Sequence, residues 1–291
     1  MACTHCSVES GPHLKDEPSD EALLRVVRDA AAAGVRSVRI TGGEPMLREA
    51  LVLSLIRECR RSGMHPLMTT NGFWGETEVD ARRRLRAMLR AGLRQLTVSY
   101  DRYHAKFQDA QPVVNIARAA QSLNFGVDIN IVRLAKDPEL EALVAVFDDL
   151  KSVRLRFYDV QPVGRARKLP TAAMRGELEG FCNACGVPSV TDDGRLIACN
   201  GPSYFADSRS PLNLGSLKDR SLEALLKHHQ QDPILETIRT FGPARLRDEL
   251  QKIPGFEQFP FRDPYAGMCA LCQHVTGSPE AIEVLRPRLS D

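Results

Sequence analysis

Seven of the eight cysteines occur in groups whose spacing suits metal binding or redox chemistry. They are Cys3 and Cys6 in C-T-H-C, Cys182, Cys185 and Cys199 in one central stretch, and Cys269 and Cys272 in C-A-L-C. Paired C-x-x-C thiols are common ligands of zinc ions and iron–sulfur clusters. Because the N-terminus lacks the features of a secretory signal, we expect metal or redox chemistry rather than structural disulfides, and a cytoplasmic protein. The eighth, Cys59, lies in an apolar helical pattern that predicts a buried structural thiol.

Four turn motifs follow apolar, β-branched runs of the chain. They are T-G-G-E-P at 41–45, T-T-N-G at 69–72, S-Y-D at 99–101 and Q-P-V-G-R-A at 161–166. Gly42 and Gly43 would let the backbone approach a ligand closely, and Glu44 could accept hydrogen bonds from an ammonium group. Each motif alone is also a common turn or helix cap. Four of them at the same end of successive strands indicate a ligand site.

Helices and strands that alternate along the chain must position these motifs. Helical periodicity occurs near 19–33, 46–62, 76–91, 110–123 and 137–150, and β-branched runs occupy 35–41, 65–71, 93–101, 126–132 and 153–160. Strands that alternate with helices predict a parallel sheet, either open or rolled into a barrel.

Polar residues alternate with apolar ones in several of these runs. The polar sets are Thr97, Ser99 and Asp101, then Asp128 and Asn130, then Arg154, Arg156 and Tyr158. An open doubly wound sheet is covered by helices on both faces, so its central strands are apolar throughout. The alternation therefore favours a barrel with a polar lumen, and a sheet with one solvent-exposed face is the alternative.

The order of C-T-H-C, T-G-G-E-P, T-N-G and S-Y-D resembles that of the radical S-adenosylmethionine (SAM) enzymes over roughly residues 1–165. The resemblance implies an α/β partial (β/α)6 TIM-like barrel that holds one [4Fe–4S] cluster and SAM. It implies that Gly42, Gly43 and Glu44 meet the methionyl amine of SAM and that His5 is the aromatic residue before the last cluster cysteine. Ser99 and Asn130, together with Asp128 and Arg156, would line the lumen beside SAM or substrate.

The N-terminal cysteines depart from that family's C-x-x-x-C-x-x-C pattern. Cys3 and Cys6 match its last two cysteines, and the first would lie four residues before Cys3. A barrel that begins with a helix also lacks its first strand. We expect the missing strand and cysteine to lie upstream of Met1, and a degenerate domain that no longer builds the cluster is the alternative.

The C-terminal cysteines resemble the SPASM or twitch-type auxiliary iron–sulfur domains of such enzymes. The stretch from Cys182 to Cys199 predicts a β-hairpin with Asp193-Gly194 as its turn. A [4Fe–4S] cluster takes at most four thiolates, and five are present. The spacing favours four of them as ligands and leaves the role of Cys185 uncertain. The four favoured ligands are Cys182, Cys199, Cys269 and Cys272. A four-thiolate zinc site is the alternative.

These observations predict a radical SAM barrel over 1–167 and a small α+β auxiliary-cluster domain over 168–291. The resemblance implies reductive cleavage of SAM to a 5′-deoxyadenosyl radical, a peptide or protein substrate, and an electron donor such as flavodoxin or ferredoxin. A non-catalytic zinc or iron–sulfur protein derived from such an enzyme is the alternative. Among 291 residues, 39 Lys and Arg balance 37 Asp and Glu. This balance predicts no nucleic-acid partner, and the absence of a long apolar run predicts no membrane span.

Overall fold

The computed structural model describes residues 1–291 except 14–16, 152, 172–173, 175–177 and 291. The chain forms two units. The first contains Met1–Cys3 and Ser10–Asp159, and the second contains Thr4–Glu9 and Val160–Asp291. The short segment Thr4–Glu9 therefore belongs with residues that follow it by more than 150 positions.

Five parallel strands in sequence order build the sheet of the first unit. They are β1 Ser37–Ile40, β2 His65–Thr70, β3 Gln95–Ser99, β4 Val127–Arg133 and β5 Val153–Asp159. Each strand pairs in parallel with the next, in the order β1-β2-β3-β4-β5. A doubly wound sheet reverses its strand order at a switch point, whereas a barrel wall does not. The partial TIM-like α/β barrel expected from the sequence is confirmed.

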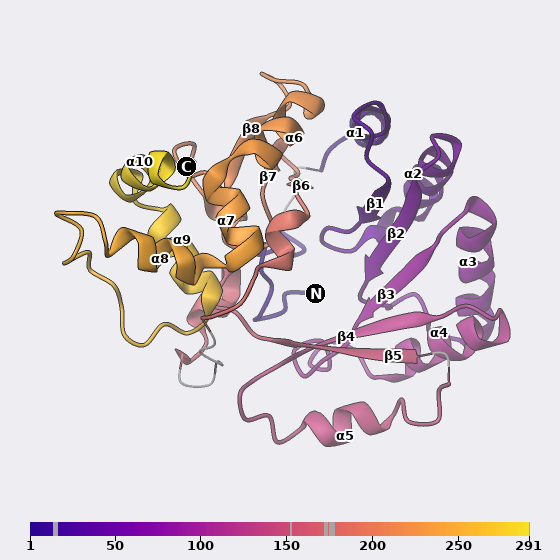
Figure 1. The fold of residues 1–291 in the computed structure, drawn as a ribbon. Helices are drawn as coiled ribbons and strands as arrows, with labels where there is room; N and C mark the ends of the chain where they lie inside the picture. Colours follow the sequence, from indigo (N-terminus) through magenta and orange to yellow (C-terminus); the bar gives the residue numbers. More distant parts are fainter. Residues whose placement is uncertain (14–16, 152, 172–173, 175–177, 291) are drawn as a thin grey trace. The chain divides into compact units, whose positions relative to one another are not determined.

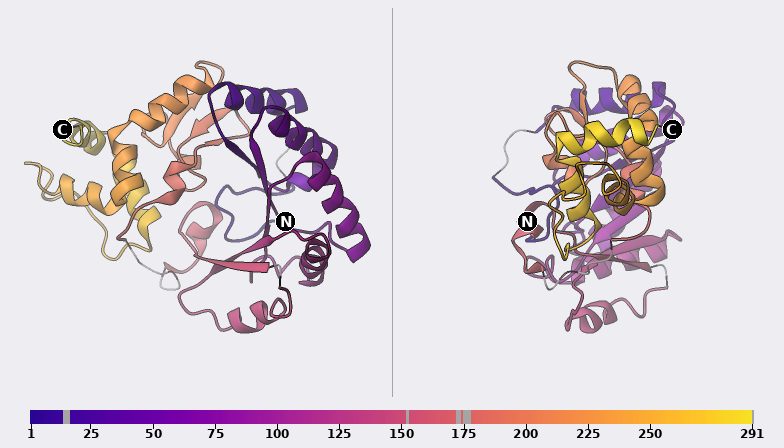
Figure 2. Two further views of the ribbon diagram at one scale, coloured as in Figure 1. Left: turned by 45° about the vertical axis from the view of Figure 1, so that its right-hand side comes forward. Right: turned by 60° about the vertical axis from the view of Figure 1, so that its left-hand side comes forward.

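Helices connect these strands and lie along one face of the sheet (Figures 1 and 2). They are α1 Asp20–Ala32, the 3-10 helix η1 Pro45–Arg48, α2 Glu49–Arg61, α3 Glu78–Ala91, α4 Gln111–Ser122 and α5 Leu140–Ala145. Ser19 and Thr77 cap α1 and α3 through their hydroxyl groups. Right-handed crossovers that all advance in one direction place every helix on the same side.

The core of the first unit lies between the sheet and this helix layer. Met68, Leu96, Val98 and Ile129 alternate along their strands and are almost completely buried. On α2, Cys59 is fully buried as expected, and burial raises the pKa of its thiol to about 11. The alternate strand positions carry the polar residues, so the opposite face of the sheet is polar.

The helix expected at 137–150 is much shorter in the structure. Only Leu140–Ala145 is helical, and none of its residues is buried. The buried apolar residues of this segment, Phe147 and Leu150, follow the helix instead of lying on it, so no packed apolar stripe extends the helix to residue 150. The expected length was wrong for this reason.

The second unit combines a small antiparallel sheet with helices. Its elements are η2 Gly164–Lys168, η4 Asn183–Gly186, β6 Ser189–Val190, β7 Arg195–Ile197, η5 Pro202–Phe205, β8 Asn213–Ser216, α6 Leu222–Gln231, α7 Pro233–Phe241, α8 Pro243–Leu250, α9 Met268–Thr276 and α10 Pro279–Arg288. Strands β6 and β7 form the expected hairpin, and Gly194 adopts a positive φ of 83° in its turn. Strand β8 completes the sheet beside β7.

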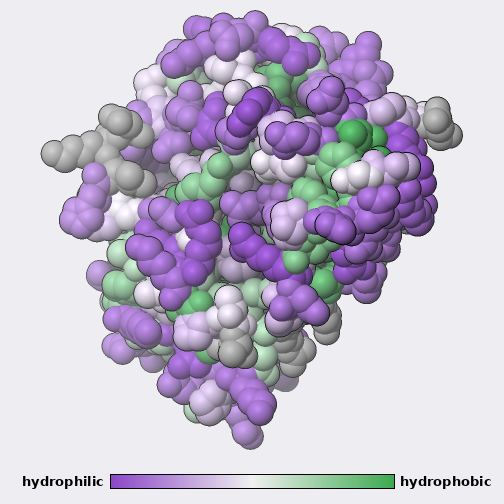
Figure 3. All heavy atoms as spheres, turned by 90° about the vertical axis from the view of Figure 1, so that its left-hand side faces the viewer, coloured by the Kyte–Doolittle hydropathy of each residue, from purple (hydrophilic) through white to green (hydrophobic). Residues whose placement is uncertain are grey.

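Among the described residues, no helix is both long and apolar enough to cross a membrane. The face in Figure 3 is mostly hydrophilic, with apolar residues scattered in small areas.

Candidate functional site

The loop after β1 carries the T-G-G-E-P motif, and the carboxylate of Glu44 ties it to the end of β2. Glu44 Oε1 accepts hydrogen bonds from the Met46 N–H at 2.9 Å and the Thr70 hydroxyl at 2.7 Å. Its Oε2 accepts the Asn71 N–H at 2.7 Å. Burial raises the pKa of Glu44, and these hydrogen bonds oppose the shift. A carboxylate offers about four lone-pair sites, so one site remains for an ammonium group.

The two glycines of this motif leave room beside the carboxylate. Gly42 has a φ of 142°, a conformation that side chains rarely allow, and a Cβ built on it would meet no atom within 4 Å. A Cβ on Gly43 would lie in ordinary contact with Ser10 at 3.7 Å. The loop thus exposes its backbone to open space, which would let a ligand approach closely.

Two rows of polar side chains cross the face of the sheet that the helices leave open. In strand register, Ser99 lies beside Asn130, and Asn130 lies beside Arg156. One layer toward the start of the strands, Thr97 lies beside Asp128. The expected lumen residues therefore share one face, because strand residues two apart point the same way.

Hydrogen bonds hold the row that lies nearer the start of the strands. Arg154 Nε donates to Asp128 at 2.7 Å, and Arg39 donates to the hydroxyls of Thr69 and Thr97 at 3.2 Å each. The face carries three arginines, Arg39, Arg154 and Arg156, and Asp128 is the carboxylate that faces two of them. The polar face of the sheet therefore has a net positive charge, which suits an anionic or strongly polar ligand.

The turn after β3 is structural in character. Asp101 is 1% exposed, and its carboxylate accepts the N–H groups of Tyr103 and His104 at 2.9 and 3.1 Å. It also accepts the Val132 N–H on β4 at 3.3 Å. Asp101 thus closes this turn and fixes it to the neighbouring strand.

The C-T-H-C segment provides Cys3, which is buried, and Cys6, which is half-buried. The backbone around Cys6 is held by the Q-P-V-G-R-A motif. Arg165 donates its N–H to the Cys6 carbonyl at 3.1 Å and its guanidinium to the Glu9 carbonyl at 2.7 Å. Cys3 and Cys6 are two thiolates, one fewer than the three of the C-x-x-x-C-x-x-C pattern that the segment resembles. The residues present therefore do not complete that ligand set.

Five thiols of the second unit gather from three parts of the chain. Cys182 immediately precedes η4, and Cys185 lies within η4. Cys199 follows β7, and Cys269 and Cys272 lie one turn apart on α9. Gln161 fixes the beginning of α9, because its side-chain oxygen accepts the Cys269 N–H at 3.4 Å. The structure thus brings together the five C-terminal cysteines singled out in the sequence.

Burial and mutual repulsion disfavour thiolates in this cluster of cysteines. Burial, with the neighbouring sulfurs second, raises the pKa of Cys269 and Cys272 far above the ordinary value. It raises the pKa of Cys185 to about 12. Buried sulfur anions that repel one another need a positive charge among them. The donor set therefore fits a metal centre.

The spacing of these sulfurs bears on the zinc site left open by the sequence. Tetrahedral zinc at about 2.3 Å from each sulfur requires sulfur–sulfur distances of about 3.8 Å. Among the described residues, no three of the cysteine sulfurs lie within 4.8 Å of one another. The described sulfurs are therefore not preformed around a single tetrahedral zinc ion.

Cys182 and Cys185 differ in their surroundings. The sulfur of Cys182 receives the N–H groups of Ala184 and Cys185, which lower its pKa against the larger effect of burial. Cys185 is 1% exposed, and its sulfur points to the Leu235 carbonyl at 3.8 Å. Donated N–H groups stabilise a thiolate ligand, whereas a carbonyl partner stabilises a protonated thiol.

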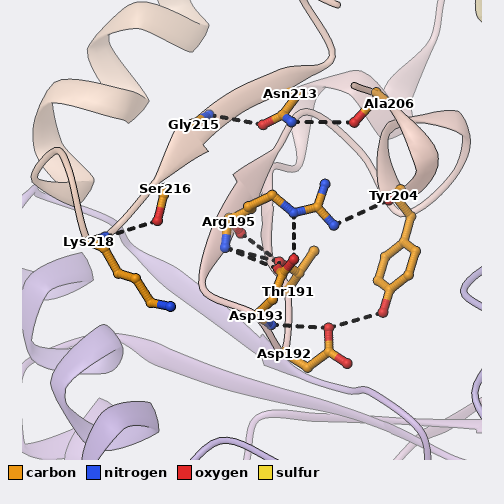
Figure 4. A network of polar contacts seen from close by, with 10 residues as sticks. All are labelled: Thr191, Asp192, Asp193, Arg195, Tyr204, Ala206, Asn213, Gly215, Ser216 and Lys218. Carbon is orange, nitrogen blue, oxygen red and sulfur yellow. Dashed lines mark hydrogen bonds and ion pairs between the residues drawn. The ribbon is translucent and has the colours of Figure 1, made fainter. Parts of the chain in front are cut away.

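Sequence reasoning missed the residues that support Cys199. The β6–β7 hairpin is closed by Arg195, whose Nε donates to Asp193 at 2.7 Å (Figure 4). The Tyr204 hydroxyl donates to Asp192 at 3.0 Å and ties η5 to the same turn (Figure 4). The Ser203 hydroxyl lies 3.0 Å from the Cys199 sulfur. The G-P-S turn just after Cys199 was the available signal.

Arg39 was also missed, although the period-two rule could have placed it. It lies between Val38 and Ile40 on β1, so it points to the polar face.

Residues 1–132 match the model of the radical SAM superfamily. The chain is 26% identical to a GTP 3',8-cyclase of Marinobacter nauticus over 282 residues, 77% of this chain and 83% of that protein. It is 20% identical to the putative peptide biosynthesis protein YydG of Bacillus subtilis over 297 residues, 98% of this chain and 91% of that protein. A crystal structure of BtrN with AdoMet and 2-DOIA aligns over 84% of both chains, with 12% identity and a TM-score of 0.49.

Proposed function

We propose that this chain, whose residues 1–132 match the model of the radical SAM superfamily, belongs to that superfamily and uses a SAM-derived radical to modify a peptide or protein. The family uses a [4Fe–4S] cluster and SAM. When bound, these cofactors supply a 5′-deoxyadenosyl radical that removes a hydrogen atom from the substrate. The observation that carries the proposal is the fixed carboxylate of Glu44, which has one acceptor site left beside the open backbone of Gly42.

Residues of the first unit would bind and orient SAM. We assign Gly42, Gly43 and Glu44 to its methionyl amine, because an ammonium group complements a buried carboxylate. Ser99 and Asn130 lie side by side on the polar face and would donate and accept hydrogen bonds to the rest of the molecule. Cys3 and Cys6 would be two of the ligands of the cluster.

We assign an auxiliary [4Fe–4S] cluster to the second unit. Its four ligands would be Cys182, Cys199, Cys269 and Cys272. The proximity of the thiols, their burial and the N–H groups donated to Cys182 support this assignment. Cys185, whose sulfur faces a carbonyl oxygen, would remain a protonated thiol. A flavodoxin- or ferredoxin-type protein would supply the electron that reductive cleavage of SAM consumes.

The peptide substrate class rests on YydG, a putative peptide biosynthesis protein that aligns with nearly the whole chain. A nucleotide is the second candidate, because the polar face carries three arginines and the GTP 3',8-cyclase is also similar. A non-catalytic metal-binding protein is the third candidate, because the five thiols of the second unit could hold a metal centre without radical chemistry.

SAM binding directly tests the role assigned to the Glu44 carboxylate. In Glu44→Gln, a charge-assisted hydrogen bond worth about 1.5–3 kcal/mol is lost, which corresponds to roughly 10- to 150-fold weaker binding. Glu49→Gln is the matched control and should bind SAM as the unchanged protein does, because Glu49 lies at the start of α2 and pairs with Arg84 at 3.2 Å. Calorimetric titration of SAM measures both. Equal affinity of the Glu44→Gln and unchanged proteins would refute the assignment of the T-G-G-E-P loop.

Release of 5′-deoxyadenosine distinguishes the three candidate functions. The reconstituted protein is incubated with SAM and a reductant, and then with either a candidate peptide or GTP. Stimulation by the peptide supports the proposal, and stimulation by GTP alone replaces it with nucleotide chemistry. A protein that holds iron but releases no 5′-deoxyadenosine would be non-catalytic.

A further inference from the structure

Ser203 lies at a position from which it can act on the auxiliary site. It is 0% exposed, on the short helix η5, and its hydroxyl oxygen is 3.0 Å from the sulfur of Cys199. Cys199 is itself buried. A thiolate ligand carries no proton, so the hydrogen bond must run from the Ser203 O–H to the sulfur whenever Cys199 binds a metal centre.

A network outside the cysteine cluster fixes the position of η5. Tyr204, the next residue, donates its hydroxyl to Asp192 at 3.0 Å, and Arg195 donates to the Tyr204 carbonyl at 3.5 Å (Figure 4). Burial, and then the nearby Asp192, raise the pKa of Tyr204 to about 12. Tyr204 therefore stays protonated near neutral pH and keeps donating. The hairpin that delivers Cys199 thus also holds the hydroxyl that faces its sulfur.

The backbone at Gly201 also lies close to the sulfur of Cys199. A Cβ built on Gly201 would lie 3.5 Å from the Cys199 sulfur, in ordinary van der Waals contact. Cys199 is 6% exposed and Ser203 is 0% exposed, so little water reaches the sulfur and the hydroxyl. In such a dry environment a donated hydrogen bond has a larger electrostatic effect than it would in water.

We infer that Ser203 is a positioning residue that raises the reduction potential of the auxiliary centre through the sulfur of Cys199. This inference rests on the proposed auxiliary [4Fe–4S] cluster. Reduction adds negative charge to a cluster and its thiolates, and a hydroxyl that donates to one of these sulfurs stabilises the added charge. Removing the hydroxyl then makes reduction harder.

A redox titration followed by electron paramagnetic resonance tests the inference. Cys3 and Cys6 are first changed to alanine, so that the signal comes from the auxiliary cluster. In this background, Ser203→Ala should shift the midpoint potential to a more negative value. Ser203→Thr keeps a hydroxyl and should restore the original midpoint potential. Ser210→Ala is the matched control: Ser210 is buried in the same unit, but its hydroxyl oxygen accepts the Leu212 N–H.

Each outcome separates this inference from the proposed cluster. Stoichiometric zinc in place of iron would overturn the cluster and, with it, the inference. A full iron load with equal potentials in the Ser203→Ala and unchanged proteins would overturn the inference alone. If Ser203→Ala cannot hold iron, Tyr204→Phe provides the second measurement, because it frees η5 from Asp192. It should shift the potential in the same direction, and an unchanged potential there would overturn the inference.

Discussion

Gly164→Ala tests how the C-T-H-C segment is held. Gly164 has a φ of 54°, and a Cβ built on it would lie 2.3 Å from the Cys6 carbonyl oxygen and 2.6 Å from that of Ser7. Left-handed backbone costs a residue with a Cβ about 1–2 kcal/mol. Displacing the two carbonyls costs about 1–3 kcal/mol more by analogy with overpacked cores. The segment that carries Cys6 should then detach more easily from Arg165.

Gly34→Ala is the matched control, because Gly34 has a φ of 76° but its Cβ would meet nothing within 4 Å. Both variants carry the backbone cost, and only Gly164→Ala carries the clash. The assay is the rate at which a maleimide labels Cys6, followed by mass spectrometry. A clash of about 1–3 kcal/mol increases the open population roughly 5- to 150-fold, so labelling should accelerate by that factor in Gly164→Ala and not in Gly34→Ala. Equal rates in the two variants would refute the close contact at Gly164.

Two further predictions concern the second unit. Cys185→Ser should keep the iron content of the unchanged protein, whereas Cys199→Ser should lose the auxiliary iron; metal analysis per chain decides, and iron loss in Cys185→Ser would contradict the four assigned ligands. Glu249→Gln should lower the free energy of unfolding by about 1 kcal/mol at pH 7, because Glu249 is 5% exposed but its partners Lys252 and Arg288 are partly solvated. Hydrogen bonds from these partners lower the pKa of Glu249, so its stabilisation is present above the unperturbed pKa of 4.5 and disappears as the pH falls through the folded value. Urea unfolding at several pH values measures this, and a difference that persists in acid would contradict it.

The fold could be predicted from the sequence because the strands follow a simple rule. Polar residues at 97, 99, 128 and 130 alternate with apolar ones, and alternation indicates that helices cover one face of the sheet. The helix expected at 137–150 is shorter because its buried apolar residues, Phe147 and Leu150, pack from the segment after Ala145. Apolar spacing alone does not show whether such residues pack from a helix or from a turn.

The candidate site could be predicted in part. Thiol spacing identified all five cysteines of the second unit, since metal ligands recur at characteristic separations. The same spacing could not distinguish the environments of Cys182 and Cys185, because a carbonyl of α7 decides that difference. The role of Ser203 could not be predicted for a similar reason. A buried serine near a cysteine has no signature until the turn that joins them is known.

The partnership between the first residues and η2 has a consequence for synthesis on the ribosome. The guanidinium of Arg165 holds the carbonyl of Glu9, 156 positions earlier in the chain. At about 5–20 residues per second, the ribosome needs roughly 8–30 s to make the intervening chain. During that time Thr4–Glu9 has been translated but lacks the residues that will hold it. The nascent thiol of Cys6 is therefore exposed to oxidants and stray metal ions for many seconds, and iron delivery to it is best timed after translation has passed η2.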